Sequence, residues 1–477
     1  MSQKPKFSRA HEGLGNQFSD PVEAAVFPQH ILRYRNDTAA QSVALHRLSD
    51  SQWVSHFGRF KPLSEDAQPS PLALRYHGHQ FQHYNPDLGD GRGFLFAQLY
   101  DLTDGRLLDL GTKGSGTTPY SRSGDGRLTL KGAVREALAT AFLRALGVNT
   151  SKTLSIVETG EQLFRGDEPS PTRSAVLVRL SHSHVRFGTF QRLNFEGNTD
   201  ALARLIDHCL EHYYPVLART GDVGADALTL LSAVVDQKAK TVAQWMAAGF
   251  VHGVLNTDNM NISGESFDYG PYRFLPAYDP GFTAAYFDHS GLYAYGRQPS
   301  AVIWNLQQLA RTLTHFAGQQ DLVAILQRYS PRLEQEIANA MFRRFGVKAP
   351  QNNNGQLDLD QANGILTQYF EGMRATDLSF QAPFFDLHGG GSDRLADAQA
   401  SSRGIHYSNG PLGDVAKAIC ALPKNTDAQV AIYDAVPDLL LPDIETIWDR
   451  IAQQDDWTAF YEKIAFFDEL QCLGHQA

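Results

Sequence analysis

The 477-residue sequence has little cysteine and no long apolar run. Its three cysteines, Cys209, Cys420 and Cys472, are far apart and odd in number, which argues against a disulfide framework and favours a reducing compartment. No stretch of about 20 apolar residues is present, and the N-terminal residues lack the apolar segment of a secretory signal. We therefore expect a cytoplasmic protein that does not act in a membrane.

The sequence also lacks an excess of positive charge. Lys and Arg number 42 against 52 Asp and Glu, which leaves a net charge of −10. This balance provides no overall basic surface for tracking nucleic acid, so we expect no nucleic-acid partner. A local basic pocket remains compatible with an acidic protein, and any phosphate site must be of that kind.

Strand signals come early in the chain. Residues 1–70 show no sustained period and are interpreted as an extension packed on the main body. From Gly93, two apolar runs are joined at Asp104-Gly105, which is a strong hairpin signal and places Lys113 at the end of the second strand. Residues 174–180 predict another strand.

Helix signals dominate the rest of the chain. Apolar residues recur at helical spacing from Leu130 to Leu146, with Gly147 as the stop signal. Further helices are predicted over residues 231–245 and from about 300 to 312, and the remainder to Ala477 is interpreted as mainly helical. Strands early and helices late indicate an α+β fold with two lobes, and 42% hydrophobic residues can fill its core.

Two glycine-rich stretches, residues 88–94 and 113–127, flank the predicted hairpin. Glycine lets backbone amides approach phosphate oxygens, and Arg92, Arg122 and Arg127 add charge there. A tight turn is the more frequent role of a Gly-Asp-Gly segment, and neither stretch matches the phosphate loop GxxxxGK[ST]. The glycines alone therefore give only weak support to a phosphate site.

Three charged residues elsewhere have two interpretations each. Arg179 and Arg186 can bind one anion if the chain bends between them, since the guanidinium fork suits phosphate oxygens. Surface ion pairs are the alternative. Glu136 falls on the polar face of the predicted helix, where a solvated charge is the simpler interpretation and a charge facing a cleft is the functional one.

The stretch His252–Gly270 is the most specific part of the sequence. Its spacing matches the catalytic loop and metal-binding turn of a protein kinase, but Val254 stands where that loop has its Asp. Asn259 and Asp268 are oxygen ligands suited to one hard cation such as Mg²⁺. Asp258 is the only carboxylate between His252 and that pair, so it is the natural replacement for the missing base.

Six stretches together resemble the selenoprotein O family, called YdiU in bacteria. They are "YHGHQFQHYNPDLGDGRG", "KGSGTTPYSRSGDGR", "VREAL", "SHVRFGTF", "GFVHGVLNTDNM" and "DYGPYRF", in this order between residues 71 and 312. The resemblance implies a protein-kinase-like two-lobed fold, with an N-terminal extension (1–70), an N-lobe (71–188), a C-lobe (189–350) and a mainly helical C-terminal extension (351–477). It also implies protein adenylylation, in which AMP passes from ATP to Ser, Thr or Tyr hydroxyls of protein substrates.

The same resemblance implies roles for individual residues, with ATP reversed in the cleft relative to kinases. The proton acceptor falls on Asp258, and the ligands of Mg²⁺ or Mn²⁺ fall on Asn259 and Asp268. Glu136 matches the helix carboxylate that pairs with the lysine, which reverses the solvated interpretation of that position. The nucleotide contacts fall on Gly89, Gly91, Arg92, Lys113, Asp125, Gly126, Arg179 and Arg186.

Two other functions use the same residues. A kinase would transfer the γ-phosphoryl group with ATP in the usual orientation, and a catalytically silent pseudokinase would only bind the nucleotide, which Val254 favours. The C-terminus departs from the family, since many members end in a Cys-Ser-Ser or selenocysteine tail whereas this chain ends "DELQCLGHQA" with Cys472 inside it. The motifs carry no information on oligomeric state or on the identity of the protein substrates.

Overall fold

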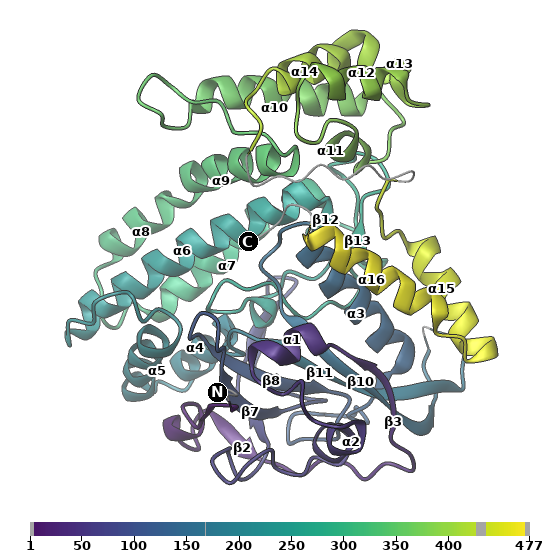
Figure 1. Cartoon of the computed structure of the whole chain (residues 1–477). Helices are drawn as coiled ribbons and strands as arrows, with labels where there is room; N and C mark the ends of the chain where they lie inside the picture. The colour runs from purple at the N-terminus through teal and green to yellow at the C-terminus, as the bar shows by residue number, and fades with distance from the viewer. Residues whose placement is uncertain (1–3, 167, 426–435, 473–477) are drawn as a thin grey trace.

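A curled antiparallel sheet forms one end of the molecule (Figure 1). The computed structural model describes residues 4–166, 168–425 and 436–472, without the side chains of the last two. The main path of the sheet runs β2-β4-β7-β8-β11-β10-β3, with β1 beside β7 and β9 beside β11. Its strands are β1 (Phe7–Ser8), β2 (Ser19–Pro21), β3 (Ile31–Arg35), β4 (Leu72–Leu74), β7 (Leu95–Tyr100), β8 (Leu107–Lys113), β9 (Leu128–Thr129), β10 (Lys152–Leu163) and β11 (Thr172–Ser181).

The hairpin predicted at Asp104-Gly105 is confirmed as β7 and β8, which pair antiparallel and end at Lys113. Gly105 adopts a φ of 76° in the connecting turn, a conformation that glycine reaches without steric cost. The strand predicted over 174–180 is confirmed within β11, which pairs with β8 so that Lys113 lies opposite Leu177 and Gly111 opposite Arg179. The sheet thus brings Lys113 and Arg179 to neighbouring strands.

The first 70 residues contribute directly to this sheet. β3 pairs with the distant β10 at the sheet edge, and β2 pairs with β4. Two helices follow β3, namely α1 (Asp37–Ser42) and α2 (Asp50–Phe57). The segment therefore shares the sheet and its apolar core with the chain that follows it.

The predicted helix from Leu130 is confirmed as α3 (Leu130–Ala145), which packs on β10 and β11. Thr129 caps its N-terminus by accepting a hydrogen bond from the Gly132 amide. α15 (Leu441–Gln454) and α16 (Thr458–Cys472) lie beside α3, where Phe467 stacks on Phe142 with ring centroids 4.6 Å apart (Figure 1). The C-terminal helices therefore support the helix that carries Glu136.

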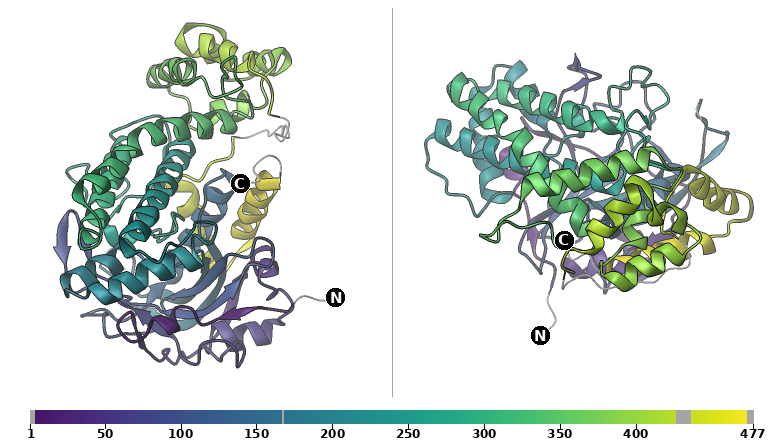
Figure 2. Two further views of the ribbon diagram at one scale, coloured as in Figure 1. Left: turned by 90° about the vertical axis from the view of Figure 1, so that its left-hand side faces the viewer. Right: turned by 90° about the horizontal axis from the view of Figure 1, so that it is seen from above.

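The remaining helices form the rest of the molecule, and Figure 2 shows α10–α14 grouped at the end farthest from the sheet. The predicted helix over 231–245 is part of α6, which begins eight residues earlier because Asp222 caps it at the Ala225 amide. The helix predicted from about 300 is α7. The helices are α4 (Phe187–Phe195), α5 (Thr199–His212), α6 (Val223–Ala248), α7 (Gln298–Thr312), α8 (Gln319–Gln327), α9 (Tyr329–Arg344), α10 (Leu359–Arg374), α11 (Ala382–Asp386), α12 (Ser392–Ala400), α13 (Gly404–Ser408) and α14 (Gly410–Cys420).

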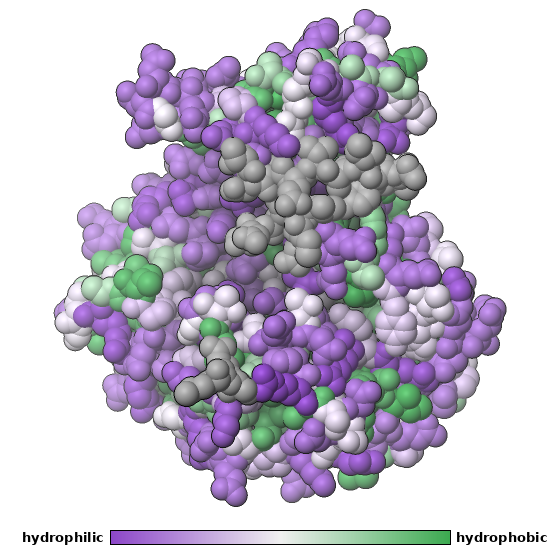
Figure 3. All heavy atoms as spheres, viewed as in Figure 1, coloured by the Kyte–Doolittle hydropathy of each residue, from purple (hydrophilic) through white to green (hydrophobic). Residues whose placement is uncertain are grey.

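Short elements connect the sheet to the helices. They are the hairpin β5 (Gly78–Gln80) and β6 (His83–Asn85), the pair β12 (Phe250–Val251) and β13 (Arg273–Phe274), and three 3₁₀ turns, η1 (Glu12–Leu14), η2 (Thr257–Asn259) and η3 (Tyr295–Arg297). The expected mixture of strands and helices is thus confirmed. The face in Figure 3 is mainly hydrophilic with scattered hydrophobic groups, and no helix among the described residues has the length and apolar character needed to cross a membrane.

Candidate active site

A cavity of about 600 Å³ lies between the glycine-rich loops, the ends of β8 and β11, and the segment 258–268. The structure brings most of the predicted site residues to its wall. Those that line it are Gly89, Gly91, Arg92, Lys113, Asp125, Gly126, Arg179, Arg186, Asp258 and Asp268. Glu136 and Asn259 are not in the lining and lie behind it.

Glu136 is buried, with 1% of its surface exposed, and so is not the solvated helix charge that its position alone favours. Lys113 donates a hydrogen bond from Nζ to Glu136 Oε2 at 2.7 Å, and Arg179 Nη1 lies 3.4 Å from Oε1. A carboxylate this deep in the protein requires such partners, because an unpaired buried charge is costly. Glu136 therefore holds Lys113 and Arg179 against the cavity.

Asp268 collects three cations at the cavity wall. Its Oδ1 lies 3.0 Å from Lys113 Nζ and 3.4 Å from Arg179 Nη1, and its Oδ2 lies 3.3 Å from Arg186 Nη1. Burial alone would raise the pKa of this carboxyl, but the three positive charges outweigh burial and hold the pKa well below its usual range. Asp268 also has a φ of 66°, a strained conformation for a residue with a side chain.

Arg186 connects the strand side of the cavity to the loop below it. Its Nη1 donates to the backbone oxygen of Asp258 at 2.8 Å, and its Nη2 lies 3.4 Å from Asp90 Oδ1. The guanidinium carbon sits 4.4 Å from the Tyr76 ring centroid and 4.8 Å from that of Phe267. These contacts fix the plane of the guanidinium group on one side of the cavity.

Asp258 has a different environment from Asp268. It lines the cavity in η2, is 9% exposed, and its Oδ1 has no hydrogen-bond partner among the described residues. Burial raises the pKa of this carboxyl to about 6, although the charge of Arg186 opposes the rise. The backbone of Gly78 approaches so closely that a Cβ there would lie 2.8 Å from Asp258 Oδ1. Asp258 thus has one buried carboxylate oxygen without a hydrogen-bond partner among the described residues, packed against the Gly78 backbone.

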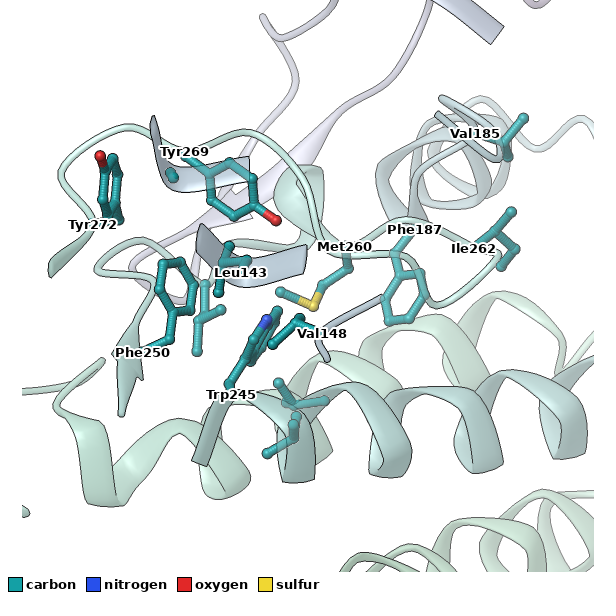
Figure 4. Close-up of a cluster of buried hydrophobic side chains, with 14 of the residues drawn as sticks. Leu143, Val148, Val185, Phe187, Trp245, Phe250, Met260, Ile262, Tyr269 and Tyr272 are labelled. Atoms are coloured by element: carbon teal, nitrogen blue, oxygen red, sulfur yellow. The ribbon is translucent and has the colours of Figure 1, made fainter. Parts of the chain in front are cut away.

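A buried hydrophobic cluster fixes the chain around η2 (Figure 4). Met260 and Ile262 follow η2 and point into this cluster, where Phe187, Trp245 and Phe250 meet them from α4, α6 and β12. The alternation of apolar and polar residues in the sequence thus separates core from cavity, since the apolar side chains hold the loop and leave its carboxylate at the wall.

Two polar bonds shape the same loop. Asn259 donates from Nδ2 to the Val254 backbone oxygen at 3.0 Å, so its side-chain amide braces the loop. Val254 does not line the cavity, although it stands at the position of the kinase base in the sequence. His252 is buried below, with its Nε2 3.1 Å from the Phe267 backbone oxygen. His252 therefore connects the loop to the turn that carries Asp268.

The glycine-rich loops form the opposite wall. Gly89 lies against the Tyr120 ring, where a Cβ would come within 2.3 Å of Cγ, so this approach requires glycine. Gly126 has a φ of 69° and lies against Gly116. Asp125 is exposed at the rim and forms an ion pair with Arg165 at 2.9 Å.

Two charged residues of the cavity lining were not predicted from the sequence. Asp90 accepts a hydrogen bond from the Leu74 amide at 3.1 Å and faces Arg186, and burial raises the pKa of its carboxyl. Its position between Gly89 and Gly91 was a signal, but a turn aspartate has the same pattern. Arg165 follows β10 and reaches the rim from 40 residues beyond Asp125, and no local pattern marks it.

Residues in the cavity wall and next to it have the donor chemistry for a hard divalent cation. Asp268 in the wall offers carboxylate oxygens, and Asn259, which follows the wall residue Asp258 in the chain, offers an amide oxygen. No group of three or more His, Cys, Asp or Glu side chains in the described ranges is already arranged as a metal site. The Cys472 side chain lies outside the described residues.

Comparison with known proteins places the chain in a class. It is 43% identical over 478 residues to a protein of Synechocystis named protein nucleotidyltransferase YdiU, which covers 96% of this chain and 97% of the relative. Proteins of the same name from Trichormus variabilis and Gloeobacter violaceus are 42% and 43% identical, each covering 96% of this chain and 94% of the relative. The class is that of the protein nucleotidyltransferases.

Comparison with models of protein families identifies the family of this chain. The model described as "Protein adenylyltransferase SelO" matches residues 2–467, so the chain belongs to the SelO family. The resemblance seen in the sequence motifs is confirmed, and so are the predicted enzyme class and activity, a nucleotidyltransferase that acts as a protein adenylyltransferase.

Proposed function

We propose that the protein transfers AMP from ATP to Ser, Thr or Tyr hydroxyls of protein substrates, and that the 600 Å³ cavity is the site of this reaction. One observation carries the assignment: the same cavity holds a carboxylate with an unpartnered oxygen and a cluster of three cations. The carboxylate of Asp258 is suited to accept a proton. The cations are suited to bind phosphates, and they are Lys113, Arg179 and Arg186.

In the proposed reaction a substrate hydroxyl oxygen attacks the α-phosphorus of ATP. The new bond joins that oxygen to phosphorus, the bond from the α-phosphorus to the bridging oxygen breaks, and pyrophosphate leaves. The hydroxyl proton passes to the Asp258 carboxylate, which lines the cavity and whose Oδ1 has no competing hydrogen-bond partner among the described residues. Positioning and charge neutralisation supply most of the catalysis in phosphate-ester transfer.

The cations neutralise the leaving pyrophosphate. Lys113 and Arg179 are held by Glu136, and Arg186 is held by Asp90 and the Asp258 backbone, so the three charges are oriented before ATP binds. Gly89, Gly91 and Gly126 let the loops approach the nucleotide, while Arg92 and Asp125 lie at the rim. In this proposal ATP lies reversed relative to kinases, so that its β- and γ-phosphates face the three cations.

A divalent cation, Mg²⁺ or Mn²⁺, would be held by Asn259 and Asp268 and would supply further neutralisation of phosphate oxygens. Asp268 would face this cation as well as Lys113 and Arg186. The low pKa of its carboxyl keeps Asp268 charged at neutral pH.

The fold proposed for this site is the kinase-like one. Strands β4–β11 with α3 correspond to an N-lobe (71–188) and the helices from α4 to α9 to a C-lobe (189–350). Residues 1–70, whose strands β1–β3 join the same sheet, and residues 351–477 correspond to extensions. The pairing of Lys113 on β8 with Glu136 on the adjacent helix supports this assignment, since kinases pair a strand lysine with a helix glutamate in the same way.

Labelled ATP tests the proposal. Protein incubated with ATP labelled at the α-phosphate should become labelled, while ATP labelled at the γ-phosphate should release its label as pyrophosphate. Label transferred from the γ-phosphate would instead identify a kinase. Binding of nucleotide without transfer of either label would identify a silent scaffold. Mass spectrometry of the product then identifies the modified hydroxyl.

A further inference from the structure

A row of aromatic rings leads from the surface to the loop that carries Asp258. Tyr286 and Phe287 are 79% and 43% exposed, with ring centroids 5.1 Å apart. Phe287 contacts Phe81 at 5.9 Å, and Phe81 contacts the buried Tyr293 at 5.0 Å. We call these four residues the aromatic row. Exposed aromatic pairs of this kind are costly in water and are typical of interaction surfaces.

The inner end of the aromatic row is bonded to the active-site loop. Tyr293 donates from its hydroxyl to Asn256 Oδ1 at 2.8 Å, and the Phe81 amide donates to the same oxygen at 3.1 Å. Asn256 directly precedes η2, in which Asp258 lies. The row is therefore continuous with the candidate active site and is not a separate hydrophobic patch.

The hairpin β5–β6 contacts both the row and the cavity. Gln80 of this hairpin lines the cavity, Gly78 approaches Asp258, and Phe81 begins the turn. Thr257 ties the hairpin to η2, since its Oγ1 accepts from the His79 amide at 2.6 Å. Phe81 and Gln82 have φ values of 49° and 65°, so the turn holds Phe81 in a strained conformation. The hairpin thus places Phe81 of the row next in the chain to Gln80 of the cavity wall.

We propose that the aromatic row binds the acceptor polypeptide of the transfer reaction, an extended segment that places an apolar side chain against Phe287 and Phe81 while its hydroxyl residue reaches Asp258. This inference rests on the proposed function, because a protein acceptor must approach Asp258 in any such transfer. An aromatic surface suits a chain segment, since rings bury a large area with little loss of side-chain freedom.

The geometry also sets a register. Gly78 lies against Asp258 at the start of β5, and Phe81 lies in the turn just after that strand, a span of at most about 10 Å at 3.3 Å per residue. Side chains two residues apart in an extended acceptor share one face, so the apolar side chain is expected two residues from the modified hydroxyl. Peptides with a leucine at that distance should therefore bind better than peptides with glycine there.

Fluorescence anisotropy without nucleotide tests this directly. The probes are fluorescein-labelled 13-residue peptides with a central Ser, Thr or Tyr and either leucine or glycine two residues to each side. The wild-type protein should bind the leucine peptides about tenfold more tightly, the loss expected when one aromatic anchor is removed from an interface. Tyr286→Ala/Phe287→Ala should lose that preference, and both residues are exposed enough for the variant to fold.

Phe195→Ala is the matched control. Phe195 is 62% exposed, and its ring contacts His77 and Tyr84 instead of the aromatic row. It should keep the tenfold preference. Equal binding of both peptides by the wild type, or an equal loss in Phe195→Ala, would overturn the proposal. Sedimentation would also overturn the proposal if the wild type and Phe195→Ala were dimers and Tyr286→Ala/Phe287→Ala were a monomer. The aromatic row would then be a contact between two copies of the chain.

The two proposals fail in different measurements. If the wild type transfers no label from α-labelled ATP, the proposed function is wrong, whatever the anisotropy shows. If label is transferred but the double variant has an unchanged KM for the leucine peptides, the docking role is wrong and the reaction stands. The expected result for the double variant is a KM raised about tenfold with kcat and the KM for ATP unchanged.

Discussion

The loop at 256–259 and the turn at 265–270 each place an aspartate on the same cavity, yet their surroundings differ. Asp268 in the turn faces Lys113, Arg179 and Arg186, which hold the pKa of its carboxyl well below the usual range. Asp258 in the loop has an oxygen without a partner among the described residues, and burial raises its pKa to about 6. The fold thus shifts the pKa values of two aspartate side chains in opposite directions.

This difference indicates a division of roles. A carboxylate that stays charged and is surrounded by cations suits electrostatic work on metal and phosphates, whereas one with a raised pKa and a free oxygen suits proton transfer. The sequence distinguishes the two by position only. The structure gives the physical reason for the two pKa shifts. Lys113 and Arg179 on the sheet lie beside Asp268, whereas the hairpin β5–β6 packs against Asp258 and buries it.

Removal of Asp268 should have the largest effect. Asp268→Ala leaves three buried cations with one counter-charge fewer and deletes a proposed metal ligand. AMP transfer should fall by roughly a thousandfold with either Mg²⁺ or Mn²⁺, the size of loss seen when a group that stabilises transition-state charge is removed. Initial rates with α-labelled ATP measure this.

Asp279→Ala is the control for that variant, since Asp279 is an exposed carboxylate in the following segment. It should transfer AMP at the wild-type rate. Circular dichroism should show a folded Asp268→Ala protein. Turnover near the wild-type value in folded Asp268→Ala would remove this residue from the site and abolish the contrast between the two regions.

Removal of a single cation should have a smaller effect. Lys113→Ala and Arg186→Ala each delete one charged contact to phosphate, worth about 1.5–3 kcal/mol. The expected loss is roughly ten- to hundredfold in kcat/KM for ATP. Lys131→Ala is the matched control, because Lys131 forms its ion pair with Glu445 away from the cavity. Unchanged kinetics in both cavity variants would place the phosphates elsewhere.

Glu265 should have the smallest effect on transfer and tests whether a raised pKa alone marks a catalytic group. It is buried in the same turn as Asp268, outside the cavity lining, and accepts from the His182 amide at 2.8 Å. Burial raises the pKa of its carboxyl to about 7, against a reference of 4.5. Glu265→Gln should change AMP transfer by less than about twofold.

The same residue should affect stability in a defined pH window. The folded state keeps the Glu265 proton up to about pH 7, whereas the unfolded state releases it near 4.5. Wild-type stability should therefore fall as pH rises between these values, by on the order of 1 kcal/mol per pH unit, and level off above pH 7. Urea unfolding of the wild type and Glu265→Gln from pH 5 to 8 measures the difference. A parallel pH dependence in both proteins would contradict it.

Local signals explain why part of the fold could be predicted. Asp104-Gly105 determines its own hairpin, and α3 carries its apolar face, its Thr129 cap and its Gly147 stop within one segment. β3 has only five residues and pairs with β10, more than 100 residues later in the chain. Its own residues show no alternation of apolar and polar side chains long enough to predict a strand. The start of α6 was missed because its cap, Asp222, lies before the first strongly apolar turn.

The site divides in the same way. The spacing of Asp258, Asn259 and Asp268 within one stretch could be predicted, and so could Lys113 at a strand end. The burial of Glu136 depends on strands that pack over it, and the pairing of Asp90 with Arg186 joins residues 96 positions apart. Such contacts are set by the tertiary fold, and a single sequence contains no local pattern for them.

Single-turnover AMP transfer by Asp258→Asn, measured with nucleotide binding on the same protein, tests the central claim most directly. The substitution keeps the shape of the side chain but removes its ability to take a proton. Asp268 and Asn259 remain, so ATP and Mg²⁺ should bind as in the wild type, while transfer should fall by roughly 10²–10⁴-fold, the usual contribution of a general base. Normal binding with normal transfer would contradict the base assignment, and lost binding would make Asp258 a ligand or structural residue instead.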